Sequence, residues 1–122
     1  MHLLRNEDAA ADLQRAIGIF EEGHVNDDIG LGKAIGNLAI VRKRTHRFAE
    51  AEAGFRRALG LLDRKHDDLS AAVVAHEYAG LLHQARREEE ANLMDRGARS
   101  RAQHGQRHNP RQTVDLSELL LR

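Results

Sequence analysis

Residues 36–64, GNLAIVRKRTHRFAEAEAGFRRALGLLDR, decide the fold class of the chain. Before the polar interval from Thr45 to Arg47, the apolar residues at helical spacing are Ile35, Leu38, Ala39 and Val41. After it, the apolar residues at helical spacing are Ala51, Phe55, Ala58, Leu59 and Leu62. Two such stripes on either side of a short polar interval predict a pair of helices joined by a turn.

The helix pair belongs to an internal repeat. RAIGIFEEGH at residues 15–24 matches RALGLLDRKH at residues 57–66, at a spacing of 42. A second match, at a spacing of 40, sets residues 38–59 over residues 78–99. It superposes small residues in pairs, namely Ala39 on Ala79, Ala51 on Ala91, and Ala58 on Ala98. A fixed period of about 40 residues is typical of stacked units, none of which can bury its apolar face alone.

These patterns predict an all-α fold of about six helices. We expect the helices near residues 3–22, 29–44, 48–65, 69–84, 88–104 and 112–121. Breaks are expected at Gly23, the Thr45 turn, His66 to Asp68, Arg86 and Arg87, and Gly105 to Pro110, where the only proline suits a helix start. The chain then reads as a single domain over residues 1–122. Its parts are a half repeat at 3–22, full repeats at 29–65 and 69–104, and a half repeat or capping helix at 112–121.

Composition excludes several functional classes. Lysine plus arginine equals aspartate plus glutamate, at 19 each, so no net charge attracts nucleic acid or an anionic membrane. Cysteine is absent, which removes disulfides, thiolate zinc sites and cysteine nucleophiles. No apolar run approaches the roughly 20 residues that a membrane span needs, and the N-terminus lacks the order of a signal peptide. We therefore expect a cytoplasmic protein with no membrane partner.

The stretch at residues 36–64 resembles the tetratricopeptide repeat. The unit length and the triplet Asn37-Leu38-Ala39 are similar to the longer repeat of kinesin light chains. In that family a small residue lets the paired helices approach, and Ala39 and Ala79 match it, while Phe55 matches the aromatic residue of the second helix. The sequence departs from the pattern at Arg42, Leu82 and Asp95, where the family usually has aromatic residues. The resemblance covers nearly the whole chain and implies a stack of antiparallel helix pairs.

The resemblance also implies a protein-interaction scaffold rather than an enzyme. In that family the first helices of successive units line a concave groove that binds a peptide, often through an asparagine and basic side chains. Asn37 matches that asparagine. The expected groove residues are Lys33, Asn37, Lys43 and Arg44 in one unit, and His76, Glu77, His83 and Gln84 in the next. Residues 33–66 carry 9 basic and 3 acidic side chains, which favours an acidic protein or peptide partner.

Other chemistry has weaker support in the sequence. No glycine-rich phosphate loop and no setting for a nucleophilic serine is present, so no catalytic residue is expected. The pairs His76 with His83 and His104 with His108 have helical spacing, but nothing completes a ligand set, and we expect no metal and no cofactor. Residues 96–111 are basic but lack aromatics for stacking bases, which argues against nucleic acid. The alternatives that remain are a nucleic-acid-associated domain and a regulatory fragment of a larger multidomain protein.

Both ends of the repeat read as unfinished. Residues 3–22 match a second helix without its first, and residues 112–121 match a first helix without its second. The apolar residues that such ends would leave uncovered are Leu13, Ile17 and Phe20 at one end, and Leu116, Leu119 and Leu120 at the other. Terminal repeats that stay monomeric normally have a polar outer face. We therefore expect self-association, with a homodimer through the terminal helices as the favoured form.

Overall fold

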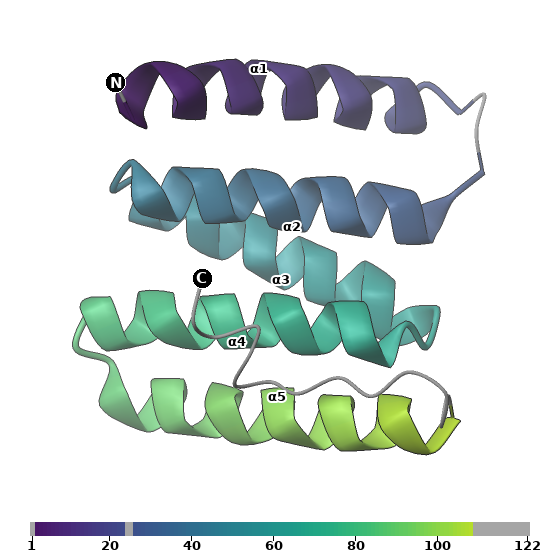
Figure 1. Cartoon of the computed structure of the whole chain (residues 1–122), viewed down its shortest axis with the longest axis vertical. Coiled ribbons are helices and arrows are strands. Elements are labelled where there is room, and N and C mark those ends of the chain that lie inside the picture. Colours follow the sequence, from purple (N-terminus) through teal and green to yellow (C-terminus); the bar gives the residue numbers. More distant parts are fainter. Residues whose placement is uncertain (1, 24–25, 109–122) are drawn as a thin grey trace. The chain divides into compact units, whose positions relative to one another are not determined.

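The computed structural model describes residues 2–23 and 26–108, and every regular element among them is a helix (Figure 1). The five helices are α1 (His2–Glu21), α2 (Asp28–Arg44), α3 (Phe48–Arg64), α4 (Asp68–Gln84) and α5 (Glu88–His108). The all-α prediction is confirmed. The sixth expected helix, at residues 112–121, lies outside the described residues together with Leu116, Leu119 and Leu120.

The helices repeat with a period of 40 residues, because α4 begins 40 residues after α2 and α5 begins 40 residues after α3. Three-residue turns follow α2, α3 and α4, and the middle residue of each has a positive φ: 61° at His46, 57° at His66 and 60° at Arg86. After α2 the His46 N–H donates to the Lys43 carbonyl (3.1 Å) and the Arg47 N–H donates to the Arg42 carbonyl (2.8 Å). This Schellman pattern satisfies the last carbonyls of the helix and reverses the chain.

An aspartate caps the first helix of each pair. The Gly30 N–H donates to Asp27 Oδ1 (2.8 Å), and 40 residues later the Ser70 N–H donates to Asp67 Oδ1 (3.3 Å). Each carboxylate satisfies an N–H group that has no partner inside the helix. The caps therefore mark α2 and α4 as equivalent first helices, and α3, whose N-cap Arg47 makes no such bond, as a second helix.

The aspartate that follows each capping aspartate links the two helices of its pair, at the end of the pair opposite the connecting turn. Asp28 lies 3.7 Å from Lys65 Nζ, at the end of α3, and Asp68 pairs with His104 near the end of α5. An antiparallel pair brings the start of one helix beside the end of the other, so each of these equivalent aspartates meets a side chain near the end of the second helix, a lysine in one pair and a histidine in the other.

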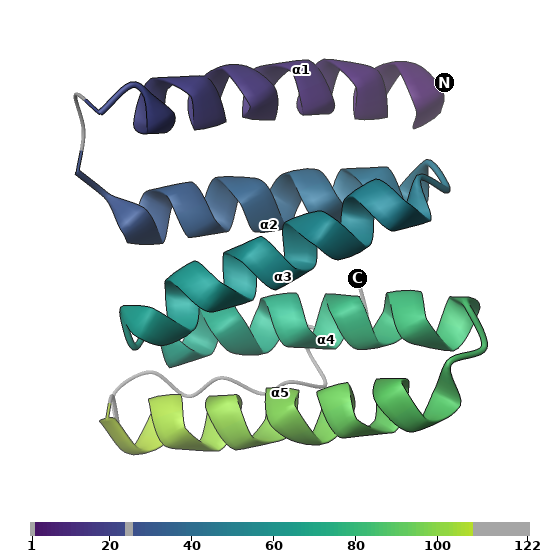
Figure 2. The ribbon, with the colours of Figure 1, turned by 180° about the vertical axis from the view of Figure 1, so that it is seen from behind.

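The chain divides into two compact units, residues 1–65 and residues 66–122, and the boundary between them in the sequence falls in the turn after α3. In the first unit α2 packs against both α1 and α3, and in the second α4 packs against α5 (Figures 1 and 2). Small residues occupy the centre of each pair. The matched alanines are at most 2% exposed: Ala39 and Ala79 on the first helices, and Ala51, Ala91, Ala58 and Ala98 on the second helices.

Helix α5 corrects one expectation from the sequence. A break was expected from Gly105 onward, but α5 continues through Gly105 to His108. Gly105 is buried, and a Cβ atom there would lie 2.7 Å from Leu69 Cδ2 and 2.9 Å from Leu69 Cγ. The glycine therefore permits the close approach of α5 to the start of α4 and does not end the helix. The predicted ends of the other helices are within one residue of those observed.

Over the part of the chain that the structure describes, no helix combines the length and the apolar character required to cross a membrane.

Candidate functional site

Helix α2 exposes a single stripe along its length. Between Leu31 and Val41 the only exposed residues are Lys33 and Asn37, and Ile40 is half-buried. Arg44 is exposed one turn later. Positions 33, 37, 40 and 44 lie on one face of a helix of 3.6 residues per turn. We call Lys33, Asn37, Ile40 and Arg44 the α2 stripe; it is an accessible face of α2.

Helix α4 exposes the equivalent stripe in the second unit. Between Ala71 and Leu82 the residues that are not buried are Val73, His76, Glu77 and Gly80, and His83 and Gln84 follow as exposed residues. We call Val73, Glu77, Gly80 and Gln84 the α4 stripe. Each of its members stands 40 residues after a member of the α2 stripe. Thus the same four positions of the repeat stay accessible in both first helices.

The structure places the expected groove residues on these two stripes or beside them. Lys33, Asn37 and Arg44 belong to the α2 stripe, and Lys43 is half-buried next to it. In the second unit Glu77 and Gln84 belong to the α4 stripe, with His76 and His83 alongside. The sequence pattern missed Ile40, Val73 and Gly80. The helical period would have found them, because each lies one turn from a residue that was named.

His83 has a partner on each ring nitrogen. Its Nδ1 lies 2.7 Å from Glu88 Oε2 and its Nε2 lies 3.1 Å from Asp95 Oδ2. The hydrogen bond with Asp95, followed by the one with Glu88, raises the pKa of His83 above its usual value, because both favour the protonated ring. His76 Nδ1 lies 3.9 Å from the other oxygen of Asp95. His83 therefore links α4 to α5, a role that the sequence pattern did not indicate.

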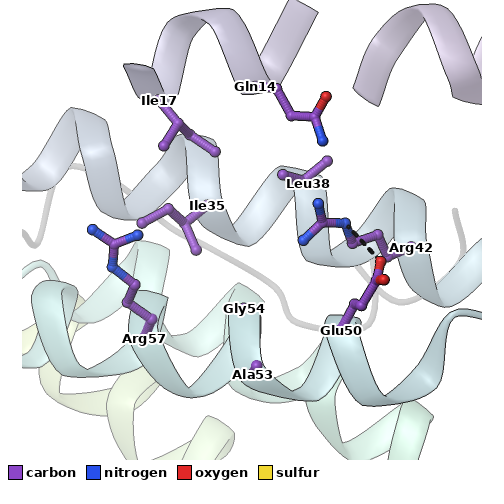
Figure 3. A pocket seen from close by; sticks show the side chains of 9 residues that line it. All are labelled: Gln14, Ile17, Ile35, Leu38, Arg42, Glu50, Ala53, Gly54 and Arg57. Atoms are coloured by element: carbon purple, nitrogen blue, oxygen red, sulfur yellow. Dashed lines mark ion pairs between the residues drawn. The ribbon is translucent and has the colours of Figure 1, made fainter. Parts of the chain in front are cut away.

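A cleft opens in the first unit, where three helices meet (Figure 3). It has a volume of about 430 Å³. Its floor is apolar and comes from α2, where Ile35 and Leu38 are each 5% exposed. Ile17 of α1 forms one wall, and Ala53 with Gly54 of α3 forms the other.

The mouth of the cleft is polar. Gln14, Arg42, Glu50 and Arg57 complete the lining. Arg42 Nε lies 3.4 Å from Glu50 Oε2, and Arg57 Nη1 lies 3.2 Å from Glu21 Oε1. Apart from Ile17, sequence reasoning missed the cleft residues, because the cleft depends on how three helices pack and has no local signal.

Helix α1 is covered on one side only. None of its residues from Arg5 to Glu21 is buried, and Ile19 is 58% exposed. Leu13, Ile17 and Phe20, the residues expected to take part in self-association, are half-buried. Phe20 already packs over the start of α2, since its Cζ would lie 2.9 Å from a Cβ atom at Gly30. Of the three, Ile17 is the residue that lines the cleft.

In the described parts of the chain, no group of three or more histidine, aspartate or glutamate side chains could hold a metal ion. The side chain of His108, one of the histidines considered as a ligand, lies outside those parts. Comparison of the chain with models of protein families, with curated proteins and with solved structures finds no match.

Proposed function

We propose that the chain is a tetratricopeptide-like scaffold that binds a partner protein or peptide through the exposed stripes of its first helices, and that it is not an enzyme. One observation carries the proposal: the positions left accessible on α2 recur on α4 at the 40-residue period. Core packing explains why the buried positions of α2 are apolar, but it does not select the side chains of Lys33, Asn37 and Arg44 on the accessible face. The cysteine-free sequence permits a reducing compartment, and we propose the cytoplasm.

The α2 stripe has the chemistry to bind an acidic peptide. The amide of Asn37 can donate and accept, so it can bond to the backbone of an extended chain. Lys33 and Arg44 lie about one and two turns from it along the same face, where they can meet carboxylates. Ile40 adds a half-buried apolar contact between Asn37 and Arg44.

The α4 stripe differs in charge. Val73, Glu77, Gly80 and Gln84 include no basic residue, and Glu77 takes the place of Asn37. An acidic ligand should therefore be selected by the first unit, whereas the second unit offers hydrogen-bonding groups and a small apolar contact. We propose that Arg44 and Asn37 contribute most to the affinity.

A selection from a random peptide library tests the proposal. Peptides selected on the full chain should be rich in aspartate and glutamate, and their binding should weaken as salt rises. Asn37→Ala and Arg44→Glu should each lower the affinity by about tenfold or more, the loss of roughly one important contact.

Arg64→Glu is the matched control, because Arg64 is exposed at the end of α3 and lies outside both stripes. It makes the same charge change as Arg44→Glu but should leave the affinity nearly unchanged. If no acidic peptide is enriched, or if all three variants bind alike, the stripes are not the binding surface.

A further inference from the structure

We propose that the cleft of the first unit binds residues 112–121 of a second copy of the chain, so that two copies exchange these segments and form a dimer. This goes beyond the binding of a partner by the α2 stripe, because it uses a different surface. Ile35 and Leu38 at the floor of the cleft lie on the face of α2 opposite Lys33 and Asn37. The two activities can therefore be tested separately.

The cleft has the form of a groove for an amphipathic helix. Its floor and one wall are aliphatic, from Ile35, Leu38 and Ile17. The opposite wall is built from Gly54 and from Ala53, which is exposed and presents only a methyl group to the cleft. Its volume of about 430 Å³ lies in the range of sites that accept several apolar groups. Helices that bind in such grooves insert apolar side chains at positions i, i+3 and i+4.

Residues 112–121 carry this pattern. Leu116, Leu119 and Leu120 stand at positions i, i+3 and i+4. On a helix of 3.6 residues per turn they share one face, with Asp115 at its edge, while Val114 lies on the far side. The segment therefore supplies the anchors that the floor of the cleft requires.

The charges of segment and cleft are complementary. On the same helical geometry Asp115, at the edge of the apolar face, is the acidic residue beside the leucines, whereas Glu118 lies on the far side with Val114. Arg42 and Arg57 stand at the mouth of the cleft, where they can meet Asp115. Arg42 and Arg57 now pair with Glu50 and Glu21, whose carboxylates are exposed. Such exposed ion pairs contribute little to stability. Since a guanidinium has five N–H donors, each arginine can donate to a further carboxylate and keep its ion pair with the first one.

Reciprocal exchange explains why two copies suffice. Each chain carries this cleft and this segment once, so two chains related by a twofold axis can fill both copies of the cleft with both segments. Closed twofold dimers are the commonest soluble oligomers, and their interface uses the same surfaces from both chains. The exchange would also cover Ile17, on a helix that is packed on one side only.

The mass of the full chain in solution, measured by light scattering after size exclusion, is the first test. At tens of micromolar the mass should be twice the 13.7 kDa of one chain. Ala53→Glu, at the wall of the cleft, and the double variant Leu116→Glu/Leu120→Glu should each raise the dimer dissociation constant by about tenfold or more. Because Ala53 is exposed, Ala53→Glu should keep the helix content of the wild type.

Two controls make the same charge change outside the proposed contact. Ala49 is exposed one turn before Ala53 on the same helix but does not line the cleft, and Val114 lies on the far face of the segment. Ala49→Glu and Val114→Glu should both leave the dimer intact. A monomeric wild type, or a dimer that Ala53→Glu and Ala49→Glu weaken equally, would overturn the proposal.

Paramagnetic broadening identifies the occupant of the cleft directly. The chain has no cysteine, so Ser117→Cys gives a single site for a nitroxide label. Labelled chains without ¹⁵N are mixed with unlabelled ¹⁵N chains, so that only contact between copies broadens a signal. The amides of Leu38, Ala53 and Gly54 should broaden, and that of Ala49 should broaden less. If none of these signals broadens in the mixture, residues 112–121 of a second copy do not occupy the cleft.

Discussion

Gly54 sets how closely α2 and α3 approach, and its replacement by alanine tests the packing of the first unit. A Cβ atom at Gly54 would lie 3.0 Å from the Cβ of Ala39 and 3.6 Å from its Cα. Ala39 is 1% exposed and its backbone belongs to α2, so it has no flexible end that could move aside. Gly60, on the same helix, has no atom within 4 Å of its added Cβ and provides the matched control.

Two effects of known size decide the outcome. Alanine is better than glycine inside a helix by about 0.8–1.0 kcal/mol, so Gly60→Ala should stabilise the protein by about that amount. Gly54→Ala has the same favourable effect on helix propensity, but overpacking against Ala39 lowers the free energy of unfolding by roughly 1–3 kcal/mol. Gly54→Ala should therefore range from nearly neutral to destabilising by about 2 kcal/mol. At roughly 4 °C per kcal/mol for a chain of this size, the two variants should differ clearly in Tm.

Thermal and urea unfolding, followed by circular dichroism, measure the difference between the two variants. Adding Ala39→Gly to Gly54→Ala removes the opposing Cβ, and the double-mutant cycle should show a favourable coupling of about 1 kcal/mol. If Gly54→Ala stabilises as much as Gly60→Ala, with no coupling to Ala39, then α2 and α3 do not approach closely enough for a Cβ at Gly54 to press on Ala39.

Two further predictions concern the turns and the charges of the second unit. Arg86→Gly and His66→Gly should each stabilise the fold by about 0.5–1 kcal/mol in urea titrations, because glycine adopts a positive φ without the cost that a side chain imposes; a loss of stability would contradict this. His83, whose pKa is raised by Asp95 and Glu88, should add stability fully below its unfolded pKa of about 6.5 and lose it as pH rises through the higher folded pKa. The urea midpoint of the wild type should therefore fall as pH rises above about 6.5, that of His83→Gln should fall less, and equal slopes would rule out the role of His83.

The repeat was predictable from the sequence because it depends on local patterns. The apolar period places α2 and α3 on either side of Thr45, and the matched alanines Ala39 and Ala79 lie buried at equivalent positions. A break at Gly105 was the natural reading of a glycine near a proline. It was wrong because Gly105 makes room for Leu69, which is 36 residues away in the sequence, and does not end the helix.

The candidate sites were predictable from the sequence only where they depend on spacing along a single helix. Asn37 and Arg44 lie on the exposed stripe because helical spacing alone defines a face of α2. The cleft and the contact of His83 with Asp95 require knowledge of how neighbouring helices cross. No spacing along one helix contains that information, so both could be found only from the folded chain.

Chemical-shift mapping of a selected acidic peptide on the ¹⁵N-labelled full chain tests the central claim most directly. The largest changes should fall on the amides of the α2 stripe, Lys33, Asn37, Ile40 and Arg44. The amides of Arg64 and Ala49, on the outer side of α3, should change little. Changes centred on α3 or α5, with the α2 stripe unaffected, would show that the accessible face of the first helix is not where this protein binds its partner.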